Sequence, residues 1–159
     1  MQRVPLLLAL ALALVVLAAT AALAAAAPPP VEAEAYFVQN SATGEVLARF
    51  DERERLPIAS ITKLMTALVA LERAGLDDVV TVARGAAAVG ESSIHLRPGE
   101  QVTVRDLLRA ALVQSANDAA TAVALHVGGG SVERFVALMN AKARRLGLTD
   151  TTFVSPTGL

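Results

Sequence analysis

The chain has 159 residues, a formal net charge of −1 and no cysteine, and its length is typical of one domain. The lack of cysteine excludes a disulfide framework, a thiol nucleophile and cysteine-ligated zinc. The balanced charge, the single tyrosine and the lack of tryptophan argue against a nucleic-acid-binding surface, which needs excess basic charge and stacking aromatic rings.

The N-terminal segment has the composition of an export signal. A short positive start precedes an apolar run over residues 4–27, which contains Ala-x-Ala patterns and is followed by three prolines. We expect residues 1–27 to be a secretory signal peptide and residues 28–34 a linker. The alternative is a retained transmembrane anchor, because the run approaches the roughly 20 residues that span a bilayer. Either interpretation places the rest in a periplasmic or other extracytoplasmic location, with membrane association left open.

Four short extended segments are predicted along the chain. Residues 35–39 and 45–50 flank a turn-rich segment and predict a β-hairpin, which the charged residues 51–55 connect to the rest of the chain. Residues 79–82 predict a short strand, and residues 151–154 a short extended piece near the end.

A helix is predicted to begin at Ser60. Apolar residues recur there at helical spacing, Pro57 precedes them, and Gly75 marks a stop. Residues three apart share a helix face, so the Ser60 hydroxyl and the Lys63 amine are expected to meet. A serine becomes an effective nucleophile when a base takes its proton, and a lysine can be that base when burial lowers its pKa. The alternative is a helix cap beside a lysine of no catalytic role.

Later helices carry recognisable start signals. Thr103 and Asp106 have the spacing of a capping box that opens one helix. A second helix is predicted over residues 119–127, and Ser131 can cap a third that ends near Gly147. The residues of this third helix that are predicted to point inward are Phe135, Leu138, Met139 and Leu146.

Ser115 and Asn117 form a second polar group between two apolar helical stretches. In an extended loop, residues two apart point to the same side. Together they could supply a hydroxyl for proton transfer and an amide for a substrate carbonyl. The alternative is that one of them caps the helix that begins near Asp118.

Ser-x-x-Lys at a helix start, followed by Ser-x-Asn, resembles the active-site signature of penicillin-binding proteins and serine β-lactamases. The flanking residues more closely resemble the low-molecular-mass D-alanyl-D-alanine carboxypeptidases. The similar segments come in the family's order and cover nearly all of residues 35–159. They are residues 57–66, 96–100, 104–108, 115–120, 135–140, 146–148 and 155–159.

The resemblance implies an α/β fold of the penicillin-binding-protein and serine β-lactamase type, a helical cluster with an incomplete antiparallel sheet. It implies that Ser60 is the nucleophile that forms the acyl-enzyme, that Lys63 is its general base and that Ser115 relays a proton. Asn117 would orient Lys63 and bind the substrate amide, and the backbone N–H of Ser60 would be one oxyanion-hole donor.

The resemblance also implies the partners of the site. The substrate would be the D-Ala-D-Ala end of a peptidoglycan stem peptide, and β-lactams, which imitate that end, would be covalent inhibitors. Neither a metal nor a cofactor is expected, and no nucleic acid.

The chain departs from the family in its third motif, a Lys-Thr-Gly-like triplet on a strand at the far side of the cleft. That strand supplies the second oxyanion donor, and the sequence holds no such triplet in place, because Thr157-Gly158 lacks the preceding lysine. We therefore expect residues 35–159 to be the N-terminal part of a DD-peptidase catalytic domain, truncated before the third motif and weak or inactive alone.

Two other functions stay open at this point. One is a non-catalytic exported module that binds peptidoglycan, and the other, less favoured, is a serine β-lactamase. A β-lactamase needs a water-activating glutamate, and Glu91 does not fit because it precedes Ser115 in the chain. Asp118 is expected to serve a helix dipole and Asn140 a structural role.

Overall fold

The computed structural model describes residues 30–159, which divide into two compact units at Glu54. The predicted signal peptide, like the alternative membrane anchor, falls on residues 1–27 and lies outside the described residues. Within residues 30–159, no helix combines the length and hydropathy needed to cross a membrane.

The first unit is the predicted β-hairpin, and the structure confirms it. Strands β1 (Tyr36–Gln39) and β2 (Val46–Phe50) pair antiparallel. The Asn40 side-chain oxygen accepts the backbone N–H two residues on at 2.9 Å, which fixes the turn. Tyr36 lies opposite Phe50 across the strands, with ring centroids 5.9 Å apart, a packed cross-strand pair.

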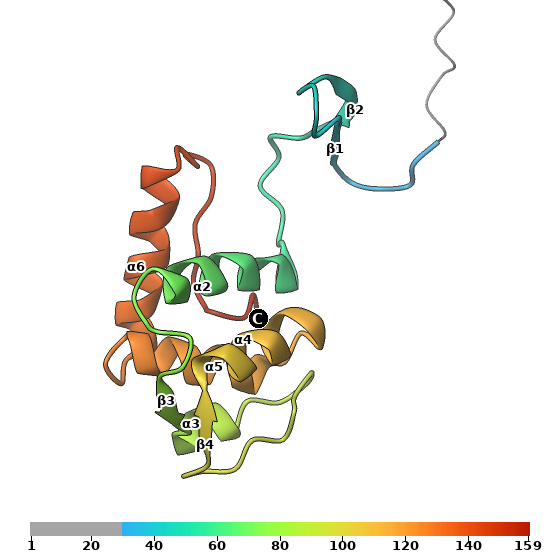
Figure 1. Cartoon of the computed structure of the whole chain (residues 1–159). Helices are drawn as coiled ribbons and strands as arrows, with labels where there is room; N and C mark the ends of the chain where they lie inside the picture. The colour runs from blue at the N-terminus through green and yellow to red at the C-terminus, as the bar shows by residue number, and fades with distance from the viewer. Residues whose placement is uncertain (1–29) are drawn as a thin grey trace, which may run out of the picture. The chain divides into compact units, whose positions relative to one another are not determined.

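The second unit is mainly helical (Figure 1). It contains η1 (Ala59–Ile61), a 3₁₀-helix, then α2 (Thr62–Leu71), β3 (Val79–Thr81), α3 (Arg84–Ala87), β4 (Gln101–Thr103), α4 (Val104–Val113), α5 (Asn117–Val127) and α6 (Val132–Arg145). Strand β3 confirms the predicted strand and pairs antiparallel with β4. Strand β4 was not predicted, because three residues are too few to show an alternating pattern.

Two predicted helix caps are confirmed. Thr103 Oγ1 accepts the N–H of Asp106 at 3.1 Å and opens α4. Ser131 Oγ accepts the N–H of Arg134, also at 3.1 Å, and opens α6. Both caps satisfy backbone donors that the first turn of a helix leaves free.

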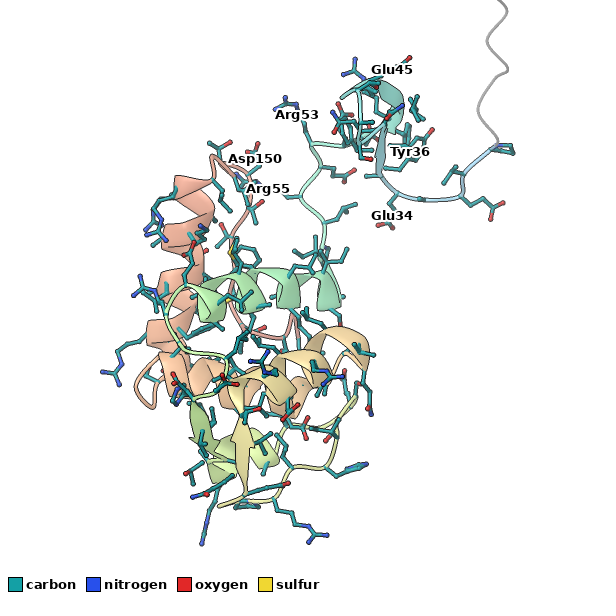
Figure 2. The ribbon with its side chains drawn as sticks, in the orientation of Figure 1. Glu34, Tyr36, Glu45, Arg53, Arg55 and Asp150 are labelled. Carbon is teal, nitrogen blue, oxygen red and sulfur yellow. The ribbon has the colours of Figure 1, made fainter. Side chains whose placement is uncertain are left out.

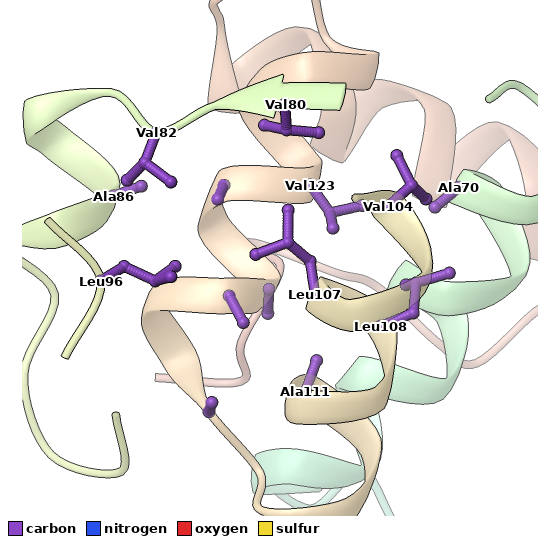
Figure 3. Packing of buried hydrophobic residues seen from close by; sticks show 14 of the residues in the cluster. Ala70, Val80, Val82, Ala86, Leu96, Val104, Leu107, Leu108, Ala111 and Val123 are labelled. Atoms are coloured by element: carbon purple, nitrogen blue, oxygen red, sulfur yellow. The ribbon is translucent and has the colours of Figure 1, made fainter. Parts of the chain in front are cut away.

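Two clusters of buried apolar side chains hold the helices together, and α5 contributes to both. The larger joins β3, α4 and α5, with Leu107 and Val123 without exposed surface (Figure 3). In the smaller, Phe135 and Met139 of α6 pack with side chains of α2, as predicted for these two residues. The prediction for Leu146 is wrong, since half of its surface is exposed where α6 ends.

The buried face of helix α2 is not the one that the spacing of its apolar residues predicts. Ile61 and Leu64 are 64% and 63% exposed, whereas Lys63 and Thr66 are 2% and 0% exposed. The helix also begins as a 3₁₀ turn and ends at Leu71, earlier than the predicted stop. Its inner face is therefore partly polar, and the site is built on that face.

The segment after α6 returns along α2 to the end of the chain (Figure 1). Asn140 holds it with two hydrogen bonds to the backbone of Phe153, one donated and one accepted, both 2.8 Å. Arg55 pairs with Asp150 at 3.3 Å on the surface (Figure 2). Residues 151–154 do not join a sheet, and Asn140 has the structural role expected of it.

Candidate active site

Three polar side chains from two segments, residues 60–63 and the connection between α4 and α5, meet at the start of α2. Ser60 Oγ lies 3.0 Å from Lys63 Nζ, Lys63 Nζ lies 3.2 Å from Ser115 Oγ, and Ser115 Oγ donates to Ser60 Oγ at 2.8 Å. Ser60 is exposed and Ser115 half-buried, whereas Lys63 is buried. The structure thus presents a hydroxyl to solvent with a buried amine directly behind it.

The backbone before Ser60 is bent sharply. Ala59 adopts a left-handed conformation with φ of +45°, which a non-glycine residue holds only where the surroundings enforce it. Ser60 then lies within η1, directly before α2. A helix start carries free N–H groups and positive partial charge, which suit a developing oxyanion.

Lys63 has an acceptor for each of its three possible N–H groups. Besides the two serine hydroxyls, its Nζ donates to the Thr157 carbonyl at 3.3 Å. Burial lowers the pKa of Lys63, because it disfavours the charged form, and the charge of Glu91 acts in the opposite direction. The structure therefore shifts this amine toward the neutral form that a base requires.

The turn at residues 155–158 supplies that carbonyl and was not assigned a role from the sequence. Gly158 has φ of +87°, and a Cβ built there would lie 1.9 Å from the carbonyl oxygen of Ala59. Only glycine lets the turn approach the start of α2 this closely. Residues 155–158 are among the segments whose sequence resembles the carboxypeptidase family. The hydrogen bond from Lys63 to Thr157 joins residues 94 positions apart, however, and no local sequence pattern predicts it.

Ser115 lies in the short connection between α4 and α5 and itself adopts a left-handed backbone conformation. Its φ is +60°, and the N–H of the following Ala116 is accepted by Ala110 near the end of α4. This conformation reverses the chain direction between the two helices and aims the Ser115 hydroxyl at Ser60 and Lys63.

Asn117 is the first residue of α5, and neither it nor Ser115 caps that helix by its side chain. The Asn117 amide nitrogen donates to the Gly90 carbonyl at 3.2 Å, and its backbone N–H donates to the Ser92 carbonyl at 2.7 Å. Among the described residues, no hydrogen bond joins Asn117 to Lys63. Asn117 thus ties the loop around Gly90 to the site.

Asp118 does more than serve the dipole of α5. The buried carboxylate accepts the Ser93 hydroxyl at 2.7 Å, the N–H of Ile94 at 3.2 Å and the N–H of Leu96 at 3.0 Å. Burial acts to raise the pKa of Asp118, but these hydrogen bonds lower it further than burial raises it. The charged carboxylate therefore anchors the loop of residues 93–96.

Histidine, cysteine, aspartate and glutamate side chains do not gather in groups of three or more that could hold a metal ion anywhere in residues 30–159. The chemistry available at the described site is that of a hydroxyl, an amine and a second hydroxyl. Such a set can transfer an acyl group through a serine ester.

Comparison with known proteins gives consistent matches. The D-alanyl-D-alanine carboxypeptidase family matches residues 22–159. The chain is 41% identical over 140 residues to D-alanyl-D-alanine carboxypeptidase DacC of Escherichia coli, covering 81% of this chain and 35% of that protein. It is 41% identical over 133 residues to DacF of Bacillus subtilis, covering 80% of this chain and 34% of that protein.

Solved structures agree with the sequence matches. A D-alanyl-D-alanine carboxypeptidase from Mycobacterium tuberculosis superposes with a TM-score of 0.79 at 36% identity, over 86% of this chain and 51% of that one. This supports the expected α/β fold of the penicillin-binding-protein type. The chain spans about a third of the length of the two curated relatives named above.

Proposed function

The chain belongs to the D-alanyl-D-alanine carboxypeptidase family, and from this premise we propose that Ser60 is the nucleophile of a serine-type D-Ala-D-Ala carboxypeptidase. The observation that carries the proposal is the triangle of Ser60 Oγ, Lys63 Nζ and Ser115 Oγ, with sides of 3.0, 3.2 and 2.8 Å. The proposed substrate is a peptidoglycan stem peptide that ends in D-Ala-D-Ala.

In the proposed acylation, neutral Lys63 takes the proton of the Ser60 hydroxyl as Ser60 Oγ attacks the carbonyl carbon of the penultimate D-alanine. The carbonyl oxygen becomes an oxyanion, and the backbone N–H of Ser60 is one of its donors. Lys63 returns a proton through Ser115 to the nitrogen of the terminal D-alanine. The C–N bond breaks, D-alanine leaves, and an ester on Ser60 remains.

Deacylation reverses these proton transfers. A water molecule loses its proton to Lys63 and attacks the ester carbonyl, the C–O bond to Ser60 breaks, and the proton returns to Ser60 Oγ. The products are the shortened peptide carboxylate and the free enzyme. Asn117, held by Gly90 at 3.2 Å, is proposed to bind the substrate amide.

The same site is proposed to react with β-lactams, whose strained amide carbonyl would take the place of the peptide bond. The ring opens when the C–N bond breaks, and the nitrogen stays attached, so the ester on Ser60 persists. A slow deacylation of this ester would separate the carboxypeptidase from a β-lactamase.

The decisive experiment is the release of D-alanine from a peptide ending in D-Ala-D-Ala by the full-length gene product. We expect turnover in the natural protein, none in Ser60→Ala, and unchanged turnover in Ser41→Ala, which alters a serine of the hairpin turn. A peptide ending in D-Ala-L-Ala should not be cleaved. Equal release by Ser60→Ala would refute the proposal and favour a non-catalytic peptidoglycan-binding module.

Export is proposed on the composition of residues 1–27 alone. Expression in a bacterial host should yield protein that is processed near residue 27 and recovered outside the cytoplasm. Recovery of unprocessed protein in the membrane fraction would support the anchor instead.

A further inference from the structure

The turn of residues 155–158 lies over Lys63, and two side chains of α2, those of Lys63 and Thr66, donate hydrogen bonds to it. Thr66 has no exposed surface, and its hydroxyl donates to the Pro156 carbonyl at 2.7 Å. The next carbonyl along the turn, that of Thr157, accepts from Lys63 Nζ at 3.3 Å. Two successive carbonyls of the turn thus meet two side chains one helical turn apart on α2.

We propose that Thr66 is a positioning residue which, by fixing this turn, keeps the Lys63 amine dry and aimed at Ser60. The inference rests on the proposed function of Ser60 and Lys63. Among the described residues, Thr66 makes no hydrogen bond to Ser60, Lys63 or Ser115. Its hydroxyl contacts the Pro156 carbonyl at 2.7 Å and the Met139 sulfur of α6 at 4.0 Å, and the bond to Pro156 is the one that links it to the turn over Lys63.

The aiming follows from the number of donors on a neutral amine. The Ser115 hydroxyl donates to Ser60 Oγ at 2.8 Å, so its oxygen is left to accept one N–H of Lys63. The Thr157 carbonyl can only accept, and it takes the second N–H. The lone pair of the amine is then left facing the Ser60 hydroxyl, the orientation that proton abstraction needs.

The dryness follows from what covers the amine. Pro156 and Thr157 are both buried, with Thr157 only 5% exposed, so the turn keeps water from Lys63 on this side. Burial is the main cause of the lowered pKa of Lys63, and Glu91 is the charged group that opposes it. A turn that moved outward would admit water and raise this pKa.

The turn has internal bonds that do not depend on Thr66. Ser155 Oγ accepts the N–H of Gly158 at 2.9 Å, and Gly158 packs against Ala59. Removal of the Thr66 hydroxyl is therefore expected to loosen how the turn docks on α2 while its own conformation persists. This separates positioning of the base from loss of the fold.

The test measures first-order acylation by a fluorescent penicillin in the full-length gene product, as a function of pH. Thr66→Val keeps the shape and removes the hydroxyl, and Thr66→Ser keeps the hydroxyl. The matched control is Thr121→Val, a buried threonine on α5 whose hydroxyl bonds within its own helix, to the Asn117 carbonyl at 2.8 Å. Label amplitude reports the folded fraction, and the rate constant reports the active site.

We expect Thr66→Val to acylate about tenfold more slowly at neutral pH, within the range that general-base catalysis supplies. We also expect the acidic limb of its pH–rate profile, the pH range in which the acylation rate constant rises as Lys63 loses its proton, to move up by about half a pH unit. Thr66→Ser and Thr121→Val should stay within about twofold of the natural protein with an unmoved limb. If Thr66→Val does not fold, Thr66→Ala replaces it, since it cannot crowd the turn.

A natural rate constant and an unmoved acidic limb in folded Thr66→Val or Thr66→Ala would overturn the inference. A fall in label amplitude alone would also overturn it, since that reports a structural role. If the natural protein carries no label on Ser60, the proposed function fails, and this result is distinct from both others.

Discussion

Lys63 unites the chemistry of the site, because it touches both serine hydroxyls and one backbone carbonyl while buried. Its lowered pKa has a consequence for stability. Between the folded pKa and the ordinary value of 10.5, the unfolded chain binds more protons than the folded one, so this group makes stability rise with pH in that window. Below the folded pKa, its charged burial opposes folding by a constant amount.

Lys63→Arg tests the base directly. A guanidinium does not give up its proton at accessible pH, so we expect acylation of Ser60 to fall by about 10²- to 10⁴-fold, the usual worth of a general base. In the natural protein, the acylation rate should rise with pH and then level off, and the pH at which the rise is half complete should lie below 10.5 because the pKa of Lys63 is lowered. A rate for Lys63→Arg within a few fold of the natural protein would exclude Lys63 as the base.

Gly158→Ala tests the close approach of the turn to α2. A left-handed residue other than glycine costs about 1–2 kcal/mol, and the Cβ at this position would lie 1.9 Å from the Ala59 carbonyl oxygen. Gly99→Ala is the matched control, since Gly99 has a similar φ of +83° and nothing within 4 Å. We expect thermal unfolding to show a larger loss for Gly158→Ala, by about 1–3 kcal/mol of overpacking, and equal losses would contradict this.

Single residues show where sequence reasoning succeeds and where it ends. The meeting of Ser60 and Lys63 follows from a spacing of three on a helix. The placement of Ser115 beside them came only from resemblance, because the two segments are 52 positions apart. Thr157 was missed, since a backbone carbonyl has no residue signature, and Asn117 contacts Gly90, which spacing does not indicate.

The loop of residues 90–96 and the start of α5 act as one element. Its anchor, Asp118, accepts three hydrogen bonds from residues 93–96 in addition to one from its own helix. Asn117 adds bonds to Gly90 and Ser92. Because Ser115 and Asn117 adjoin this anchor, the loop and the site are expected to loosen together.

Asp118→Asn should destabilise the fold by about 2–3 kcal/mol at neutral pH, because bonds to a charged acceptor are lost and an amide cannot accept at both positions. The pKa of Asp118 is lowered in the folded state. Its stabilisation is therefore fully present above the ordinary value of 3.8 and is lost as pH falls through the folded pKa.

Chemical denaturation at several pH values measures this effect. The control is Asp150→Asn, which alters the exposed pair with Arg55 and a long, exposed hydrogen bond from the Thr149 hydroxyl, and it should cost less than about 1 kcal/mol. A loss for Asp118→Asn no larger than that of the control would contradict the anchoring role.

At the scale of elements, local signals predicted well and buried faces poorly. The caps at Thr103 and Ser131 were readable because cap and donor lie three residues apart. The inner face of α2 was not, because its burial depends on α5, α6 and the 155–158 turn. Lys63 and Thr66 are on the buried face of α2, so the elements that pack against this helix, and not the spacing of its apolar residues, determine which face is buried.

The second unit, taken by itself, leaves apolar surface uncovered. Leu64 and Leu71 of α2 and Val113 of α4 are 63%, 54% and 88% exposed, and a hollow of about 480 Å³ lies between these helices. Surfaces of this kind promote association, so we expect the 159-residue chain to self-associate when purified.

The central claim is that Ser60 is a nucleophile activated by Lys63. Its most direct test is peptide mapping of the full-length gene product after reaction with a β-lactam. We predict one acyl group, on the peptide that contains Ser60, absent in Ser60→Ala and strongly reduced in Lys63→Arg. An acyl group on a different residue, or undiminished labelling of Ser60→Ala, would contradict the account.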